Sequence, residues 1–195
     1  MTHAMTKVDR RVIKSQHAIK QAVIELMSEK NFDQITIQDI ADKANVSRKT
    51  IYLHYADKFD LLDKLTEEYI DKLRKLCETA CEMDWRPATQ ICFEYLQSNY
   101  SFFSTMLASK GAPYFRNRFL EFQIEEFKNE LHKTNEIRDD VSEEVFLRFV
   151  GTAYTGIVEW WLTNGMPYSP HVLAEQVGTL LETIYNSSSS TKMLG

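Results

Sequence analysis

The sequence predicts an all-α fold of about nine helices, with a small three-helix N-terminal domain followed by a larger helical domain. Apolar residues recur at helical spacing through most of the chain, and no stretch shows the alternation of a half-buried strand. The 6 Gly and 4 Pro residues fall mostly at expected helix ends. We therefore expect domains at residues 1–60 and 61–186, and a flexible tail at 187–195 that begins with a run of serines.

Three helices are expected in the N-terminal domain. The first covers about residues 10–29, where apolar residues repeat every three to four positions. Thr36 is expected to cap the second helix, with Asp39 completing a capping box. Asn45 tolerates left-handed backbone angles in a tight turn, and Ser47 caps a short third helix.

Six further helices are expected in the larger domain. Their limits are set by capping residues and by Gly and Pro, namely Asp57, Pro87, Gly111 to Pro113, Ser142, Gly165, Pro167 and Pro170. The fourth helix begins at Asp57 and is long enough to connect the two domains.

Composition and charge exclude several classes of protein. Hydrophobic residues make up 44% of the chain, which is too many for a disordered protein. Residues 1–60 carry a net charge of +2 and the remainder −7, so a basic N-terminal part suits local contact with phosphates. No secretory signal or membrane-spanning apolar run is evident, and we expect a cytoplasmic protein with reduced cysteines.

The stretch TIQDIADKANVSRKTIYLHYADK, from Thr36 to Lys58, predicts a helix-turn-helix that binds DNA. Two short helices joined by a three-residue turn can cross at a wide angle around a small apolar core. The second of them presents donors, acceptors and cations over a span that fits a major groove, namely Ser47, Arg48, Lys49, Thr50, Tyr52 and His54.

This stretch and the residues that flank it, about residues 9–65 in all, resemble the DNA-binding domain of the TetR family. The resemblance implies that Arg48, Lys49 and Thr50 face the bases. It also implies that the DNA backbone is contacted by Tyr52, His54, Lys58 and, near a phosphate, Thr36. The segment GIVEWWLTNGMPYSP further resembles a Gram-positive subgroup of the family that includes a coactivator of dihydroxyacetone kinase expression.

Structural roles for the same residues remain open at this point. Arg48 and Lys49 could form an ordinary solvated face, and Tyr52 could be a core aromatic residue with an exposed hydroxyl. Arg10, Arg11 and Lys14 could form an arm that reaches DNA or simply a mobile basic terminus.

The larger domain is rich in aromatic residues, which either fill a helical core or line an apolar effector pocket. The candidate pocket residues are Phe93, Tyr100, Phe103, Phe119, Phe122, Tyr154 and Glu159. A small apolar or aromatic molecule is therefore a candidate partner.

The last two helices are candidates for a homodimer interface, because the eighth is apolar around most of its circumference. By resemblance, they would pack against their copies through Phe149, Ala153, Gly156, Trp160, Val177, Leu180, Leu181 and Ile184. A two-fold dimer would place two reading helices about 34–36 Å apart, one turn of B-DNA. The alternative is a monomer with a thick core.

We find no phosphate-binding, dinucleotide-binding or nucleophile-elbow motif, and we expect no enzyme, metal or cofactor. Cys77 and Cys81 could bind metal or form a redox pair, but buried inert thiols are favoured. The favoured function is a dimeric repressor that binds a palindromic operator and is released by a small-molecule effector. Alternatives are a coactivator that acts through a protein partner and, more remotely, an enzyme with an unfamiliar site.

Overall fold

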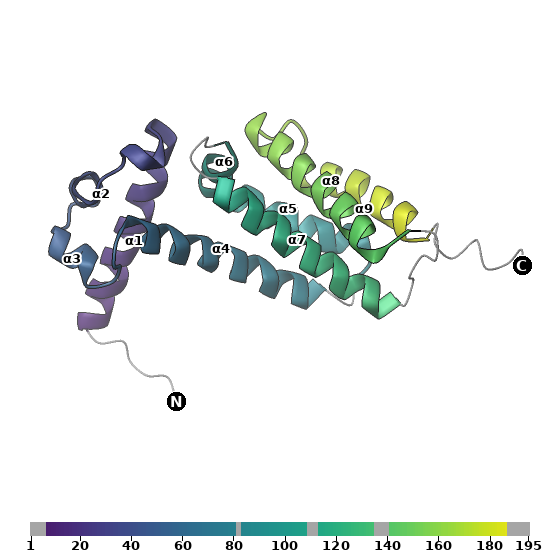
Figure 1. Ribbon diagram of the computed structural model, residues 1–195, viewed down its shortest axis with the longest axis horizontal. Helices are drawn as coiled ribbons and strands as arrows, with labels where there is room; N and C mark the ends of the chain where they lie inside the picture. The colour runs from purple at the N-terminus through teal and green to yellow at the C-terminus, as the bar shows by residue number, and fades with distance from the viewer. Residues whose placement is uncertain (1–6, 81–82, 109–112, 135–140, 187–195) are drawn as a thin grey trace, which may run out of the picture. The chain divides into compact units, whose positions relative to one another are not determined.

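The computed structural model describes residues 7–80, 83–108, 113–134 and 141–186, and it is all-α over those ranges (Figure 1). The expected tail at 187–195 lies outside the described residues. The chain divides into two compact units. Among the described residues, the N-terminal unit contains residues 7–69, and the C-terminal unit contains residues 70–80, 83–108, 114–134 and 141–186.

The N-terminal unit contains the three expected helices and the start of a fourth. Its elements are α1 (Lys7–Glu29), the 3₁₀-helix η1 (Phe32–Gln34), α2 (Ile37–Ala44), α3 (Arg48–Tyr52) and the first half of α4 (Lys58–Ala80). A compact core joins them, with Val23 of α1, Ile40 of α2 and Ile51 of α3 completely buried. α1 begins before Arg10, so Arg10, Arg11 and Lys14 are helical residues and do not form an extended arm.

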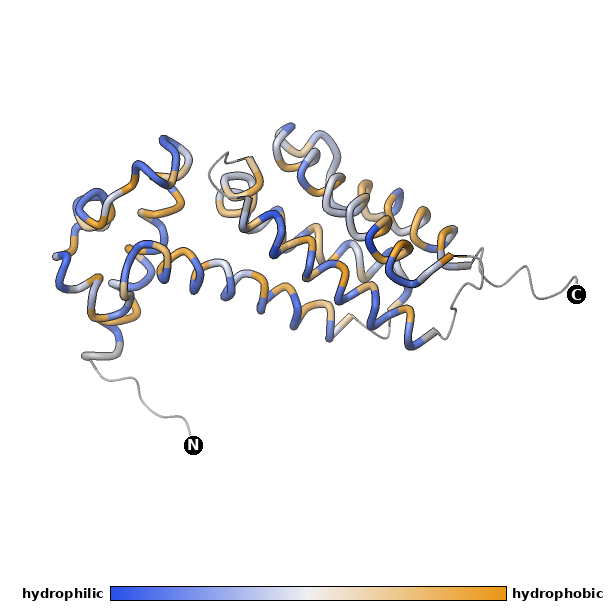
Figure 2. The backbone as a smooth tube through the Cα atoms, viewed as in Figure 1, coloured by the Kyte–Doolittle hydropathy of each residue, from blue (hydrophilic) through white to orange (hydrophobic). Residues whose placement is uncertain are grey.

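The C-terminal unit contains the second half of α4 and five more helices. These are α5 (Trp85–Ser98), α6 (Tyr100–Ala108), α7 (Pro113–Thr134), α8 (Glu143–Thr163) and α9 (Pro170–Asn186). Helix α5 packs along α9, and α6 packs on α8. Hydrophobic and hydrophilic residues alternate along α7 (Figure 2), as expected for a helix with one buried side.

Aromatic side chains form much of the core of the C-terminal unit. The Phe93 ring of α5 lies 5.2 Å from that of Trp161 and 5.9 Å from that of Tyr154, both on α8. A second cluster joins Phe103 of α6 to Phe119 of α7 with ring centres 6.2 Å apart. Such edge-to-face and tilted contacts bury large apolar areas and fix the packing of the helices.

Candidate DNA interface and effector cavity

The turn between α2 and α3 is held by local hydrogen bonds. The Thr36 hydroxyl accepts from the Asp39 N–H at 3.1 Å, and the Thr36 N–H donates to the Asp39 carboxylate at 2.8 Å, which completes the capping box. Asn45 adopts left-handed angles (φ 52°, ψ 47°) and ends α2. These features agree with the sequence analysis, because each depends on residues within four positions of one another.

Helix α3 displays the side chains expected to read DNA. The Ser47 hydroxyl accepts from the Thr50 N–H at 3.1 Å and so caps the helix. Ile51 is fully buried, whereas Tyr52 is 56% exposed and Arg48 and Lys49 are also exposed. Neither cation forms an ion pair or a side-chain hydrogen bond within the described ranges. α3 therefore offers two uncompensated positive charges and a phenol to a binding partner.

Other residues that were expected to contact DNA form local hydrogen bonds within the chain. The Thr50 hydroxyl lies 2.9 Å from that of Ser47, and the Thr36 hydroxyl donates to the Asp39 carboxylate at 2.9 Å. His54 is partly exposed, and its carbonyl accepts from Lys64 at 3.2 Å. On the polar side of α3, Arg48, Lys49 and Tyr52 are therefore more available to a binding partner than the hydroxyl groups are.

Lys58 differs from the expectation. Its ammonium group donates to the carbonyls of Phe32, Asp33 and Ile35 at 3.0, 3.0 and 2.9 Å, and it lies 4.9 Å from the centre of the Phe32 ring. An ammonium group has three donors, and all three are engaged. The structure thus assigns Lys58 to holding η1 against the start of α4, which explains a cation in the first turn of a helix without a phosphate.

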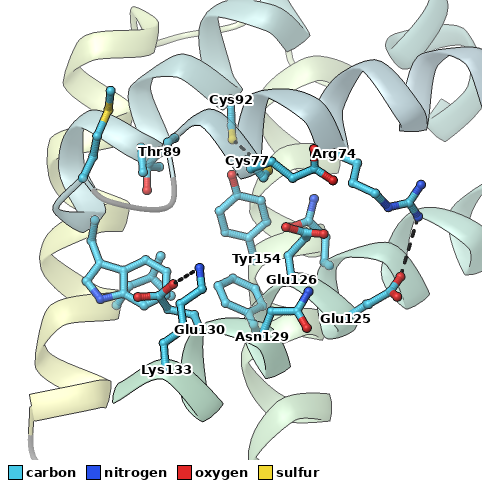
Figure 3. Close-up of a pocket in the computed structure, with 18 of the residues that line it drawn as sticks. Arg74, Cys77, Thr89, Cys92, Glu125, Glu126, Asn129, Glu130, Lys133 and Tyr154 are labelled. Atoms are coloured by element: carbon cyan, nitrogen blue, oxygen red, sulfur yellow. Dashed lines mark hydrogen bonds and ion pairs between the residues drawn. The ribbon is translucent and has the colours of Figure 1, made fainter. Parts of the chain in front are cut away.

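A cavity of about 860 Å³ opens in the C-terminal unit between α4, α5, α7, α8 and α9 (Figure 3). Its apolar wall includes the rings of Trp85, Phe127 and Tyr154; the Phe127 ring lies 6.0 Å from that of Trp85 and 5.5 Å from that of Tyr154. This volume lies within the range of sites for small molecules, about 300–1,000 Å³.

Three neutral polar side chains in the cavity wall belong to buried residues, and their polar atoms open onto the cavity. Thr89, Gln123 and Tyr154 are 4, 7 and 6% exposed. None of their side chains forms a hydrogen bond with another described residue. Buried polar groups are normally paired, so these three are available to a ligand or to water in the cavity.

Two thiols also face this space. The sulfur atoms of Cys77 and Cys92 lie 3.7 Å apart, and Figure 3 shows the Tyr154 hydroxyl directed toward them. The contact with Cys92, together with burial, raises the pKa of Cys77 far above its usual range. Burial and the two nearby thiols likewise raise the pKa of the Tyr154 hydroxyl. These groups therefore stay neutral near pH 7, which disfavours a thiolate nucleophile. Cys81, the partner considered for Cys77, lies outside the described residues.

The expected effector residues are mostly placed elsewhere. Of the seven, only Tyr154 lines the cavity. Phe93, Phe103, Phe119 and Phe122 are buried in the aromatic core, because large apolar side chains gain most from full burial. Tyr100 is exposed, and Glu159 forms an ion pair with Arg116 at 2.9 Å. Sequence reasoning missed Thr89 and Gln123, whose signal was a polar residue within the buried stripe of an amphipathic helix.

The expected interface residues divide into two groups. Phe149, Ala153 and Trp160 are exposed along one face of α8, and Leu180 is exposed on α9. Gly156 lies on the same face of α8, with open space where a Cβ would stand. Ile184 is partly exposed. Val177 and Leu181 are instead buried within the chain, because they lie on the side of α9 that packs inside the unit, and they are not part of this face.

No group of three metal-binding side chains comes together in the part of the chain that the structure describes. None of the described helices is both long and apolar enough to span a membrane.

Both parts of the chain match family models. Residues 19–65 match the model described as bacterial regulatory proteins, tetR family. Residues 83–183, just over half of the 195-residue chain, match a transcriptional regulator C-terminal region of the same family.

Two related regulators match this chain over only part of their own length. The uncharacterized HTH-type transcriptional regulator YxbF of Bacillus subtilis (strain 168) is 25% identical over 171 residues, which is 84% of this chain and 43% of YxbF. YvdT of the same strain is 38% identical over 52 residues, 27% of each protein. The chain thus spans less than half the length of either relative.

Several solved structures are similar over most of both chains. A TetR regulator from Streptococcus agalactiae 2603V is 26% identical with a TM-score of 0.69, covering 89% of this chain and 96% of its own. The dihydroxyacetone kinase operon activator DhaS is 20% identical (TM-score 0.65; 89% and 97% covered). FadR from Bacillus subtilis, in complex with stearoyl-CoA, is 19% identical with a TM-score of 0.64, covering 85% of this chain and 96% of its own. The last two similarities concern the fold alone.

Proposed function

Because this chain belongs to the TetR family of bacterial transcriptional regulators, we propose that it is a cytoplasmic repressor that binds a palindromic operator as a homodimer and is released by a small molecule. The observation that carries the proposal is the exposed polar side of α3, where Arg48 and Lys49 have no partner among the described residues while Ile51 anchors the helix. Cations held on a rigid, capped helix can enter a major groove at little entropic cost.

The exposed side chains suggest different roles in binding. Arg48 is expected to read a base edge, since a guanidinium can donate two parallel hydrogen bonds to guanine. Lys49 and Tyr52 are expected to reach phosphates or base edges beside it. Thr50 and Thr36 add less, because their hydroxyl groups are engaged by Ser47 and Asp39.

Selection of bound sequences from random DNA duplexes tests this assignment. Wild-type protein is expected to enrich a two-fold symmetric site. Arg48→Ala should relax base preference at one position of each half-site, at a cost of about 1–3 kcal/mol. If the variant loses affinity equally for all sequences, or if the wild type enriches no symmetric site, the proposal is wrong.

Salt dependence gives a second test with a matched control. If Lys49 contacts a phosphate, Lys49→Met should reduce the slope of log K against log salt by about 1. Lys43→Met also removes one positive charge from the same unit, but Lys43 is paired with Glu29 at 2.9 Å and Glu25 at 3.3 Å. The control should leave the slope unchanged, and equal effects of both changes would contradict a specific contact by Lys49.

The homodimer is supported by the apolar face of α8 and α9. Phe149 and Trp160 are large exposed apolar residues at helical spacing, and the small residues Ala153 and Gly156 between them would let another helix approach closely. Leu180 adds to this face from α9.

Sedimentation velocity tests the dimer. Phe149→Glu combined with Trp160→Glu should give monomers at micromolar concentrations, because two carboxylates would be buried without partners. Gln97→Glu, at an exposed position on α5, serves as the control and should remain dimeric. A dimer that persists in the double variant would show that this face is not the interface.

A further inference from the structure

The charged residues around the cavity are predominantly acidic. Five carboxylate side chains line it, from Glu78, Asp84, Glu125, Glu126 and Glu130, against two permanent cations, Arg74 and Lys133. With His132 neutral, the lining carries a formal charge of −3. The mouth of the cavity is therefore negative before any ligand enters.

Both cations are already engaged. The Arg74 guanidinium lies 2.7 Å from the Asp71 carboxylate and 3.6 Å from that of Glu125, and the Lys133 ammonium lies 3.3 Å from the Glu130 carboxylate (Figure 3). An anionic ligand would have to break these pairs before it could use either cation. Among lining residues that the structure describes, no further permanent cation is available.

Three of the carboxylates have no such compensation. Glu78, Asp84 and Glu126 form no ion pair or side-chain hydrogen bond within the described ranges. Glu126 is partly buried, and this burial raises its pKa; Arg74 acts in the opposite direction, while Glu125 and Glu78 raise the pKa further. A carboxylate in this position would be stabilised by a cation that entered the cavity.

The inner wall adds groups that suit the body of such a ligand. The rings of Trp85, Phe127 and Tyr154 offer faces to which a cation or an aromatic group can bind. The unpartnered Thr89 and Gln123 side chains and the Tyr154 hydroxyl can accept hydrogen bonds from an ammonium group or a neutral donor. These buried groups indicate a ligand site independently of the acidic mouth.

From this combination we propose that the cavity takes an organic cation, an amine with an apolar or aromatic body, and disfavours carboxylates and phosphorylated ligands. The inference rests on the proposed effector role of the cavity and names the class of molecule that would fill it. The volume of the cavity would admit a cationic or an anionic ligand of this size. The negative charge of the lining is what favours the cation.

Three probes of one shape and different charge test the proposal: 4-phenylbutylamine, 4-phenylbutanol and 4-phenylbutanoate. Their affinities for the full chain can be measured by calorimetry at neutral pH. The amine should bind most tightly and the carboxylate most weakly, with about tenfold between amine and alcohol, as expected for one charge-assisted contact. A carboxylate that binds as tightly as the amine, or no binding by any probe, would overturn the proposal.

Variants place the binding in this cavity. Glu126→Gln should weaken the amine about tenfold and leave the alcohol unchanged. Glu78→Gln, at an exposed lining position, tests the same charge effect if the first variant folds poorly. Glu144→Gln is the control, since Glu144 is exposed on α8, pairs with Arg148 and does not line the cavity. An unchanged preference for the amine in both lining variants would contradict the proposal.

Operator binding, measured with and without the amine, distinguishes failure of the ligand class from failure of the regulatory role. If the amine binds with the expected preference but leaves operator binding unchanged, the ligand class stands and the effector role fails. If no operator is bound at all, the regulatory proposal fails, while the ranking of the three probes still decides the ligand class.

Discussion

Replacing Lys58 with Met decides whether this side chain stabilises the N-terminal unit or contacts DNA. The ammonium donates to three carbonyls of the segment around η1, contributed by Phe32, Asp33 and Ile35. Met is also an unbranched side chain, and it lacks the charge and the donors, including the ammonium group 4.9 Å from the centre of the Phe32 ring. The change therefore removes the hydrogen bonds together with the charge.

The expected loss can be worked from these contacts. The three hydrogen bonds share one partly exposed ammonium group, so we count them together as one charged contact of about 1.5–3 kcal/mol. The cation over Phe32 adds about 0.5–1 kcal/mol. Removing a cation from the first turn of α4 returns about 0.3–1 kcal/mol, because it opposed the helix dipole. We expect the free energy of unfolding to fall by about 2 kcal/mol. For a chain of this length, the melting temperature should fall by about 4–8 °C.

Thermal unfolding followed by circular dichroism measures this change, and operator titrations at several salt concentrations measure DNA contact. Lys58→Met should lower the melting temperature and leave the salt slope of binding unchanged. Lys49→Met should leave the melting temperature within the small range of surface changes, because Lys49 is exposed. The structural role would be refuted if Lys58→Met left the melting temperature unchanged and reduced the salt slope of operator binding by about 1. That result would instead support a phosphate contact by Lys58.

Three further predictions concern single features of the fold. Hydrogen bonding by the Thr36 backbone and by Lys30 lowers the pKa of Asp39 from 3.8 to about 2, so its contribution to stability is present above pH 3.8 and lost as the pH falls toward 2. Acid titration of Asp39→Asn should therefore show a smaller loss of stability over that interval, and an identical curve would contradict the assignment. Gly178→Ala should lower the free energy of unfolding in urea by about 1–3 kcal/mol, because the added Cβ would lie 2.7 Å from the Arg86 Cγ and 2.9 Å from its Cα. An unchanged free energy of unfolding would contradict this steric argument. Cys77 should react slowly with a thiol reagent at pH 7 and rapidly after unfolding, because its pKa is raised; rapid labelling of the native protein would contradict this.

The local features of the helix-turn-helix could be predicted because each depends on neighbours in the sequence. Thr36 and Ser47 cap helices through backbone groups three residues away, and Asn45 adopts left-handed angles by its own conformational preference. The same reasoning located the start of α8 at Ser142. The exposure of Arg48 and Lys49 followed from the buried position of Ile51 on the same short helix.

Lys58 shows what local reasoning leaves out. Its three acceptors lie 23 to 26 residues earlier in the sequence, in a segment whose carbonyls are turned toward it by η1. A short segment without periodicity carries no signal that its carbonyls converge on one point. The sequence alone therefore favoured a phosphate as the partner of an otherwise misplaced cation, and only the fold supplied the alternative.

The lining of the cavity could not be predicted for a different reason. Aromatic content predicts where burial is greatest, and Phe93, Phe103 and Phe119 are indeed fully buried, but full burial leaves no surface for a ligand. A binding site presents a few polar groups to a cavity and does not pack them into the core. Thr89 lies one helical turn before Phe93, and Gln123 lies between Phe119 and Phe127, so each interrupts an apolar stripe. Neither side chain is hydrogen-bonded by another described residue, so its presence in the stripe is a better signal of a ligand site than the aromatic residues around it.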